Sequence, residues 1–339
     1  MYKDALLRIV ARQDLDEEQM TRVMDSLMDG ELTDTQVAAF MAALATKGET
    51  FAELAGAARS MRRKAVRVQV QAPVVVDTCG TGGDAAGTFN ISTTAAFVVA
   101  GAGVTVAKHG NRSISSKCGS ADVLEALGLR LDVDAEIVEE GIGVWGIGFL
   151  FAPLYHGALR HAAKARAEVG IRSIFNMLGP LCNPAGANCQ LLGVFAPELC
   201  EMFAQALKLL GTKRAMVVHG HDGLDEISVC APTRVTELND GLIRTYDIDP
   251  EQFLGRTVNA GDLAGGTPAD NAQIVRNILG GEKGPRRDVV VANAGMALVA
   301  AGAAETFADG MGKAGDAIDS GSARRKLEGL IQFTVDNAD

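Results

Sequence analysis

Apolar side chains in the first 65 residues recur at the spacing of helix faces. Between residues 20 and 28 they follow the i, i+3, i+4, i+7, i+8 pattern of a single face. The pattern recurs between 37 and 44 and again between 54 and 61. It predicts a small bundle of antiparallel helices with a core of methionine and leucine side chains.

Polar residues mark the ends of these helices. Thr33 with Gln36, and Thr50 with Glu53, have capping-box spacing, in which side chains satisfy the free amides of a helix start. Gly48 comes between the second and third apolar stretches and predicts a helix end. The sequence therefore indicates helix boundaries as well as helix faces.

After residue 65 the pattern changes to short β-branched runs that alternate with alanine-rich segments. Residues 74–76 predict a strand, a glycine-rich loop follows, the segment from 92 predicts a helix, and 104–107 predicts the next strand. Further strands are expected at 191–195, 215–219 and 289–292. This order predicts an α/β fold with a parallel sheet and site loops at the carboxyl ends of its strands.

Composition narrows the classes of function. The chain has 339 residues, a net charge of -10 and 5% aromatic residues, which disfavours a nucleic-acid or membrane-surface binder. No apolar run reaches the length of a membrane span, and the N-terminus lacks a signal-peptide core, so we expect a cytoplasmic protein without membrane contact. The six cysteines form no CxxC pair and predict neither a zinc knuckle nor a disulfide framework.

The stretch DTCGTGGDAAGTFNIST joins the first predicted strand to its helix. Its glycines at 80–83 would let backbone amides approach an anion, and Asn90, Ser92 and Thr93 add side-chain donors at the helix start. The spacing matches neither GxxxxGK[ST] nor GxGxxG. Phosphate binding and a tight turn without a ligand are both compatible with this loop.

A second loop, within KHGNRSISSKCGSADVLEALG at 108–128, follows the next predicted strand. It places Lys108, Arg112 and Lys117 among several serines, ahead of a helix at 121–127. In an acidic protein such a loop favours a polyanion, although a solvated loop is the ordinary alternative. Two such loops at one sheet edge suggest a substrate with two phosphate centres.

The segment HGHDGLDEISV places Asp222, Asp225 and Glu226 just beyond a predicted strand, with His219 and His221 before them. Carboxylates beside bound phosphate suit Mg2+, which keeps several waters. Zinc lacks a third ligand at a familiar spacing. A general acid and base pair, or a simple polar turn, remains open.

Three arginines precede an apolar turn that ends at Pro180 and Pro184. Arg160, Arg166 and Arg172 could each clamp a carboxylate on a flat ring, because a guanidinium matches a carboxylate with two parallel hydrogen bonds. Each could equally form a surface salt bridge. Sequence patterning does not choose among the three.

Five motifs taken together resemble the anthranilate phosphoribosyltransferase family of tryptophan biosynthesis. They are DTCGTGGD, NIST, KHGNRSISSKCGSADVLEALG, RAEVGIRSIFNMLGPLCNP and GLDEIS, and the resemblance spans essentially the whole chain. It implies transfer of the 5-phosphoribosyl group from phosphoribosyl pyrophosphate (PRPP) to the amine of anthranilate, with release of pyrophosphate. This is the second step of tryptophan biosynthesis from chorismate, and the resemblance implies a magnesium-assisted, oxocarbenium-like displacement.

The resemblance also implies a fold and an assembly. The fold is that of the class II nucleoside phosphorylases, with a small helical domain hinged to a larger α/β domain that has a mostly parallel central sheet. We expect the helical domain at 1–70, rejoined by about 160–190, and the α/β phosphoribosyl-binding domain at 71–159 and 191–339. A homodimer joined through the helical domains is expected.

Site residues follow from the match of each position to the family motifs. The positions that resemble the PRPP site are Gly80, Gly83, Asp84, Thr88, Asn90, Ile91, Ser92, Thr93, Lys108, His109, Gly110, Asn111, Arg112, Ser113, Ile114, Ser115, Ser116 and Ser120. Those that resemble the magnesium site are Ser92, Asp225 and Glu226. Those near anthranilate are Gly80, Asn111 and Arg166, with His109, His156 and Pro180 lining the same cleft.

The resemblance assigns catalytic roles to Lys108, Asp225 and Glu226, which would neutralise the leaving pyrophosphate together with Mg2+. No residue stands out as a general base, because the amine can lose its proton after attack. Cys118 and Gly157 depart from the family pattern, which has serine or threonine and proline there.

Two other functions are compatible with the same fold, a nucleoside phosphorylase and a nucleic-acid-binding relative without catalytic activity. A nucleoside phosphorylase would need base-recognition residues in place of Arg166 and Asn111. A non-catalytic relative that binds nucleic acid is disfavoured by the net negative charge and by the carboxylates at 225 and 226.

Overall fold

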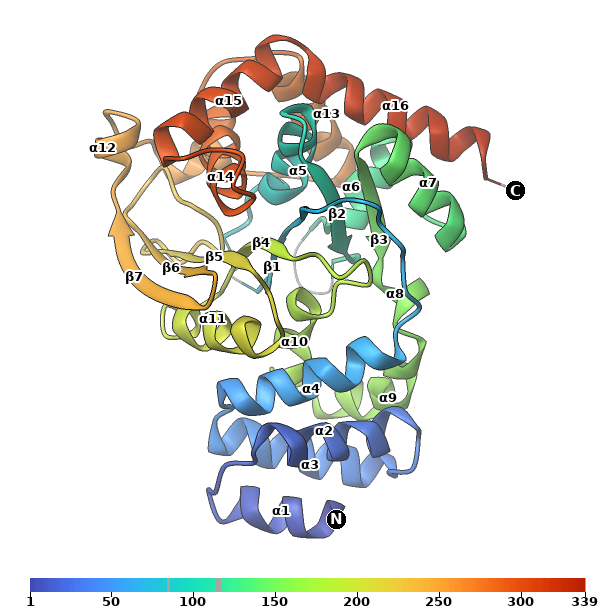
Figure 1. The fold of residues 1–339 in the computed structure, drawn as a ribbon. Helices are drawn as coiled ribbons and strands as arrows, with labels where there is room; N and C mark the ends of the chain where they lie inside the picture. The colour runs from blue at the N-terminus through green and yellow to red at the C-terminus, as the bar shows by residue number, and fades with distance from the viewer. Residues whose placement is uncertain (84–85, 114–116, 339) are drawn as a thin grey trace.

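A seven-stranded sheet runs through the upper half of the molecule (Figure 1). The computed structural model describes residues 1–83, 86–113 and 117–338. In spatial order the strands are β3 (Ile147–Phe151), β2 (Thr105–Gly110), β1 (Val75–Gly80), β4 (Cys189–Gly193), β5 (Arg214–Gly220), β6 (Thr233–Asn239) and β7 (Leu242–Ile248). Pairing is parallel from β3 to β5 and antiparallel for β6 and β7, which confirms the predicted mostly parallel sheet.

The register of the parallel strands brings the predicted loops together. Gly80 ends β1 opposite Gly193 of β4, and Gly110 ends β2 opposite Phe151 of β3. Because parallel strands share one carboxyl edge, the glycine loop after β1 and the basic loop after β2 leave the sheet at the same edge.

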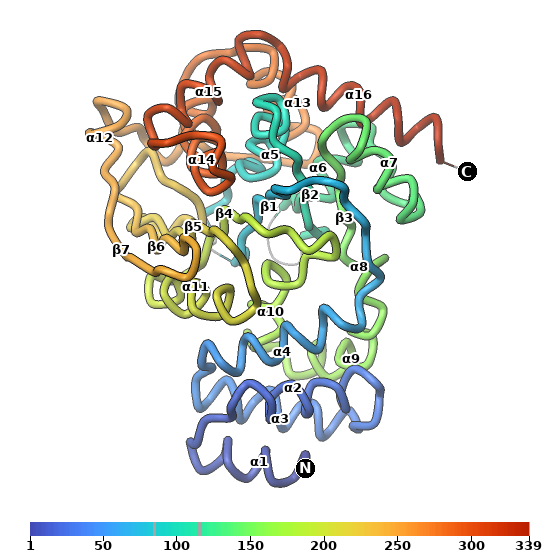
Figure 2. The backbone as a smooth tube through the Cα atoms, viewed as in Figure 1, coloured from blue at the N-terminus to red at the C-terminus, as the bar shows by residue number. Residues whose placement is uncertain are grey.

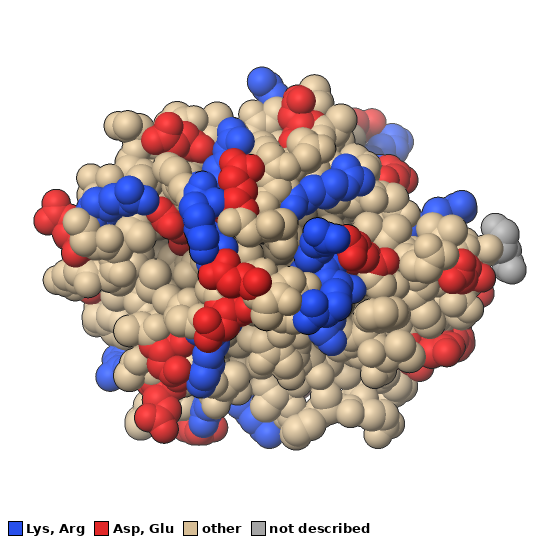
Figure 3. Space-filling model, turned by 90° about the horizontal axis from the view of Figure 1, so that it is seen from above, with Lys and Arg blue, Asp and Glu red and all other residues tan. Residues whose placement is uncertain are grey.

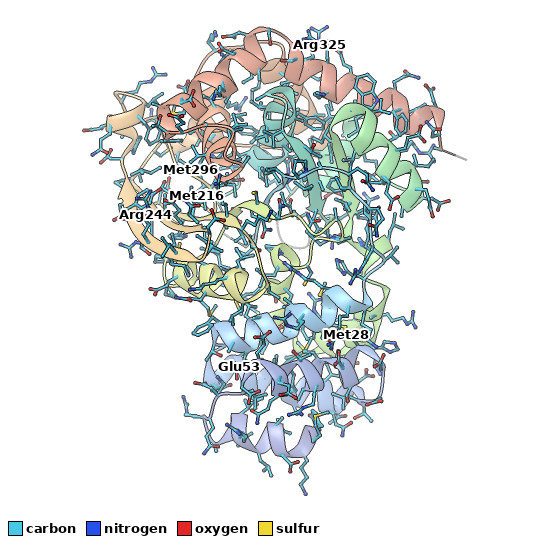
Figure 4. The ribbon with its side chains drawn as sticks, in the orientation of Figure 1. Met28, Glu53, Met216, Arg244, Met296 and Arg325 are labelled. Carbon is cyan, nitrogen blue, oxygen red and sulfur yellow. The ribbon has the colours of Figure 1, made fainter. Side chains whose placement is uncertain are left out.

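Helices cover both faces of the sheet (Figure 2). The upper layer contains α5 (Ile91–Gly101), α6 (Ser120–Leu127), α7 (Ala135–Trp145), α13 (Pro268–Leu279), α14 (Pro285–Ala300), α15 (Phe307–Asp319) and α16 (Ser322–Asp336). Below the sheet lie α10 (Ile174–Leu178) and α11 (Leu199–Leu209). Met216 of β5 and Met296 of α14 belong to one buried cluster between sheet and upper layer, and lie close together in Figure 4.

The predicted strand at 289–292 is wrong, because these residues lie within α14. Pro285 opens that helix, Asp288 stands in its first turn, and nearly every position from Val289 to Leu298 is buried. A helix buried all round loses the alternation of apolar and polar faces, so its Val-Val-Val-Ala run cannot be distinguished from a buried strand.

A block of helices lies at the lower end of the molecule (Figure 1). It contains α1 (Tyr2–Val10), α2 (Glu17–Met28), α3 (Asp34–Lys47) and α4 (Phe51–Lys64), with α2 packed on α4. Both predicted capping boxes are present, at the starts of α3 and α4. The later helix α9 (Arg160–Val169) packs on α3, so a distant part of the chain joins this block.

Short elements connect the layers. They are α8 (Ala152–Tyr155), α12 (Pro250–Phe253) and the 3-10 turns η1 (Gly157–Leu159), η2 (Gly179–Leu181) and η3 (Ala260–Leu263). Arg62 of α4 also links the block to η2 and to the end of α11, because it donates to the carbonyl oxygens of Leu181 and Leu210 at 2.6 and 3.4 Å.

Charges on the upper face are mixed in sign. In Figure 3, blue and red side chains lie beside one another over this face. Asp319 at the end of α15 pairs with Arg287 of α14 at 2.6 Å and with Lys283, which precedes α14, at 2.9 Å. Among the described residues, no helix is both long enough and apolar enough to cross a membrane.

A fully buried carboxylate organises the helical block. Glu53, labelled in Figure 4, accepts hydrogen bonds from the amides of Leu15 and Thr50, both at 2.9 Å. Lys47 donates to it at 3.0 Å, and the Lys47 side chain is itself only 3% exposed. One carboxylate therefore joins the chain ahead of α2, the end of α3 and the start of α4.

Glu53→Ala is expected to lower the free energy of unfolding by about 3–5 kcal/mol, because it leaves the buried Lys47 charge without this partner. Urea unfolding followed by circular dichroism would measure the loss. The matched control is Glu18→Ala, which removes an exposed pair with Arg22 and should change stability by less than about 0.5 kcal/mol. Equal losses in the two variants would contradict the role assigned to Glu53.

Candidate active site

The glycine loop after β1 is packed against Asp225. The Gly82 amide donates to the Asp225 carboxylate at 2.9 Å. A side chain at Gly80 would meet this carboxylate, and one at Gly193 would meet the Asp225 backbone. Gly82 and Gly83 have φ angles of 65° and 78°, in the left-handed region that favours glycine. These glycines are therefore needed for close approach and for the turn itself.

The carboxylate of Glu226, from the segment after β5, contacts the start of α5. Its carboxylate accepts a hydrogen bond from the Ser92 amide at 3.0 Å. Burial, reinforced by the negative charge of Asp225, raises the pKa of Glu226 to about 8. Because the negative charges of Asp225 and Glu226 repel each other, a cation bound between their carboxylates would be stabilising.

Lys108 approaches the same place from β2. It is buried, donates to the Thr78 carbonyl oxygen, and interacts electrostatically with Asp77 and Glu226. Burial lowers its pKa, and the nearby acidic groups oppose that shift. The three residues predicted to be catalytic, from β2 and from the segment after β5, therefore lie at one edge of the sheet.

Asn293 of α14 fixes the backbone just after Glu226. Its side chain is fully buried, accepts from the Ile227 amide at 2.9 Å and donates to the Ile227 carbonyl oxygen at 3.0 Å. A helix from the C-terminal third therefore holds the carboxylate segment in place.

The predicted donors at the start of α5 are partly engaged within the protein. Asn90 donates to the Cys118 carbonyl oxygen at 3.1 Å and accepts from Asn271 at 3.0 Å. Ile91 and Thr93 are each 1% exposed, and Thr88 forms a bridge with Ala264. The Cys118 thiol donates to Asn90 at 3.4 Å, so this departure from the family pattern keeps a polar contact.

The basic loop after β2 carries its own counter-charges. Arg112 pairs with Glu125 at 2.6 Å and with Asp122 at 3.2 Å. Asp122 also accepts from the Ser113 amide at 3.0 Å, and Ser120 donates to the Asn111 carbonyl oxygen at 3.2 Å. The loop is thus held by the first turns of α6. The predicted residues Asp84, Ile114, Ser115 and Ser116 lie outside the described residues.

A buried polar network ties the segment after α10 to the sheet. Asp77 of β1 accepts from the His109 amide at 3.1 Å and from the Asn183 side chain at 2.8 Å. Gln190 of β4 donates to the Pro180 carbonyl oxygen at 2.7 Å. Sequence reasoning missed Asp77, Asn183 and Gln190. For Asp77 and Gln190 the signal is visible, because a polar residue within an apolar strand indicates a buried partner.

His109 and His156 form a buried pair. Their Nε2 atoms lie 3.2 Å apart, and His109 Nδ1 lies 3.1 Å from the Gly179 carbonyl oxygen. Because a carbonyl oxygen only accepts, His109 carries its proton on Nδ1, and the Nε2 proton of the pair belongs to His156. Burial lowers the pKa of His109 to about 3 and that of His156 to about 4, so both rings are neutral at pH 7.

The structure separates the three arginines that the sequence left equivalent. The Arg166 guanidinium lies 5.2 Å from the Phe175 ring centre, and it makes no hydrogen bond or ion pair with the described residues. Burial lowers its pKa. Arg172 donates to the Gly83 carbonyl oxygen, and Arg160 is exposed. Arg166 is therefore a partly buried cation with its hydrogen-bond donors available to a ligand.

Comparison with known proteins finds matches to one enzyme family along nearly the whole chain. Residues 3–65 match the helical bundle domain of the glycosyl transferase family, and residues 72–324 match its a/b domain. Anthranilate phosphoribosyltransferase from Syntrophobacter fumaroxidans is 69% identical over 337 residues, covering 99% of this chain and 100% of that protein. The chain belongs to the anthranilate phosphoribosyltransferase family. It is therefore an enzyme of the glycosyl transferase class, and the predicted resemblance is confirmed.

Solved structures of the family share the fold. Anthranilate phosphoribosyltransferase from Thermus thermophilus matches with a TM-score of 0.92 and 42% identity, covering 98% of this chain and 99% of that one. The Saccharomyces cerevisiae protein in complex with PRPP and Mg matches with a TM-score of 0.89 and 28% identity, covering 99% and 98%. The predicted helical domain and larger α/β domain are confirmed.

The free energy of unfolding should depend on pH because the folded histidine pair stays neutral. An unfolded histidine takes up a proton below about pH 6.5, whereas these two folded rings resist protonation down to about 4 and 3. The unfolded state therefore binds more protons in this window, and stability falls as pH falls, by up to about 1.4 kcal/mol per pH unit for each ring.

Urea midpoints at pH 7, 6 and 5 would measure this dependence. His156→Gln should flatten it, and His221→Gln, which removes an exposed histidine, is the matched control. An identical dependence in wild type and His156→Gln would contradict the assignment.

Proposed function

We propose that the protein transfers the 5-phosphoribosyl group of PRPP to the amine of anthranilate, giving N-(5-phosphoribosyl)anthranilate and pyrophosphate. The observation that carries this proposal is the meeting of Lys108, Asp225 and Glu226 beside the glycine loop and the start of α5. Near-complete coverage by relatives of that name supports it. The yeast relative has been observed with PRPP and Mg, and separately with 4-fluoroanthranilate.

The phosphates of PRPP are held at the edge of the sheet where β1 and β2 end. Backbone amides of the glycine loop and the amide end of α5 suit an anion, aided by the helix dipole. We assign this role to the PRPP residues predicted from the sequence. The Gly82 amide, which here donates to Asp225, is one such donor.

The residues present fit magnesium. Asp225 and Glu226 provide oxygen ligands, and Ser92 provides a hydroxyl beside them. Burial, reinforced by the charge of Asp225, raises the pKa of Glu226, and a bound cation would favour its ionised form. The described residues contain no cluster of three or more His, Cys, Asp or Glu side chains suited to a metal. This agrees with an ion that takes its remaining ligands from water and substrate phosphate. Bound there, magnesium would supply charge neutralisation for the departing pyrophosphate.

The remaining residues orient the acceptor. Arg166 binds the carboxylate of anthranilate with its guanidinium fork, beside the Phe175 ring. The amine attacks the anomeric carbon as the bond to pyrophosphate breaks, and the nitrogen then loses its proton. Placement and charge compensation therefore account for catalysis without a covalent intermediate.

The family relationship also supports an assembly and a division into domains. We propose a homodimer joined through the helical domains, where α1 exposes Leu7 and Val10 by 58% and 66%. The helical domain comprises about 1–70 and 160–190, and the α/β domain comprises 71–159 and 191–339. Packing of α9 on α3 supports this division.

The activity is tested by mixing the protein with PRPP, magnesium and anthranilate and following the loss of anthranilate fluorescence. Loss that requires all three components is expected. Asp225→Asn and Glu226→Gln should lower kcat by at least about 10–100-fold and raise the magnesium requirement. Asp240→Asn, in the turn between β6 and β7, is the matched control and should behave as wild type. Unchanged kinetics in both carboxylate variants would remove these residues from the site.

Arg166→Ala should raise the KM for anthranilate by about tenfold or more, because a hydrogen-bonded charge pair is lost. The KM for PRPP should change far less. Arg166→Lys should not restore binding, since an ammonium group lacks the planar fork. Arg160→Ala removes the same charge from the exposed start of α9 and is the control. A larger effect on PRPP than on anthranilate would contradict the role given to Arg166.

A further inference from the structure

Arg172 reaches from the segment between α9 and α10 to the glycine loop. Its Nη2 donates to the Gly83 carbonyl oxygen at 3.0 Å. Its guanidinium carbon lies 3.9 Å from the centre of the Phe195 ring, just beyond β4. Three segments that are far apart in sequence therefore meet at one exposed arginine.

The backbone at Gly82 and Gly83 is held from two sides. On the sheet side, the Gly82 amide donates to Asp225, and the Thr81 amide donates to the Gly193 carbonyl oxygen at 2.9 Å. On the other side, Arg172 holds the Gly83 carbonyl. A Cβ atom at Gly83 would lie 2.6 Å from Arg172 Nη2, so the bare glycine backbone is what permits this contact.

A short segment connects Arg172 to Arg166. The Gly170 amide donates to the Arg166 carbonyl oxygen at 3.1 Å and ends α9 with a φ of 65°. Two residues later, the chain reaches Arg172, and the amide of the buried Ser173 beside it donates to the Asn176 side chain at 3.0 Å at the start of α10. A short segment with defined ends therefore separates the Arg166 side chain from the Gly83 contact.

We propose that Arg172 is a positioning residue that sets the distance between the phosphoribosyl loop and the acceptor side of the site. The proposal rests on the function given above. Arg172 holds Gly83 relative to the end of α9, and α9 carries Arg166. Displacement of a reacting group by about 1 Å can lower a rate roughly 100-fold. The contact thus aligns two substrates that bind to different parts of the fold.

The test compares Arg172→Ala, Arg172→Lys and Phe195→Leu with Arg160→Ala, which removes an equal charge from the same region. Calorimetric titration with pyrophosphate and magnesium measures the phosphate side without requiring turnover. Steady-state kinetics measure KM for each substrate and kcat. Hydrogen exchange of the peptide that contains Gly82 measures the order of the loop, because that amide is hydrogen bonded.

For Arg172→Ala we expect pyrophosphate binding about tenfold weaker, a higher KM for PRPP with a smaller change for anthranilate, and faster exchange at Gly82. Arg172→Lys and Phe195→Leu should give intermediate effects, since each keeps part of the contact. Arg160→Ala should match wild type. Loss of binding with unchanged exchange would overturn the proposal, because Arg172 would then contact the ligand itself rather than position the loop.

The experiments distinguish a failure of the positioning role from a failure of the proposed transferase activity. If wild type turns over anthranilate and Arg172→Ala is indistinguishable from Arg160→Ala, the positioning role is wrong and the transferase stands. If wild type is inactive, the proposed transferase fails. The exchange and pyrophosphate measurements then decide whether Arg172 still orders the loop.

Discussion

The buried carboxylate of Asp77 joins parts of the chain that meet only in the folded molecule. It lies on β1, accepts from the backbone of β2 at His109, and receives the side chain of Asn183 from beyond η2. Asn183 also donates to the Ala107 carbonyl oxygen at 2.7 Å. Burial raises the pKa of Asp77 to about 6, and the donors and the Lys108 charge oppose the shift. The site loops begin at the ends of these strands, so their position depends on this network.

The charged side chains around the site are also paired with nearby groups of opposite charge. Arg112 is balanced by acidic residues of α6, and Lys108 interacts electrostatically with Asp77 and Glu226. An acidic protein can therefore present a site for a polyanion without a basic surface, because its cations and amides converge at one edge of the sheet. The mixed charges of the upper face agree with this local arrangement.

Features set by neighbours in sequence could be predicted, and features set by distant neighbours could not. The capping boxes at Thr33 and Thr50, and the order of β1, glycine loop and α5, follow from short spacings and were recognisable. The run at 289–292 was misassigned because a helix buried on all sides shows no periodicity. The choice among the arginines depended on where Phe175 and Gly83 lie in space. The partners of Asp77 are separated from it by 32 and 106 residues, which no local pattern encodes.

The contact between Asn293 and the backbone after Glu226 has a consequence for how the protein is made. Every residue assigned to substrate, metal or catalysis occurs at or before position 226, yet the side chain that pins this segment comes 66 residues beyond Ile227. A nascent chain that has already exposed all the chemical groups would still lack their final arrangement. We therefore expect enzymatic activity to arise only once α14 has emerged from the ribosome and packed against the segment after Glu226. The last third of the sequence, which holds none of the residues assigned to the site, would then determine when activity begins.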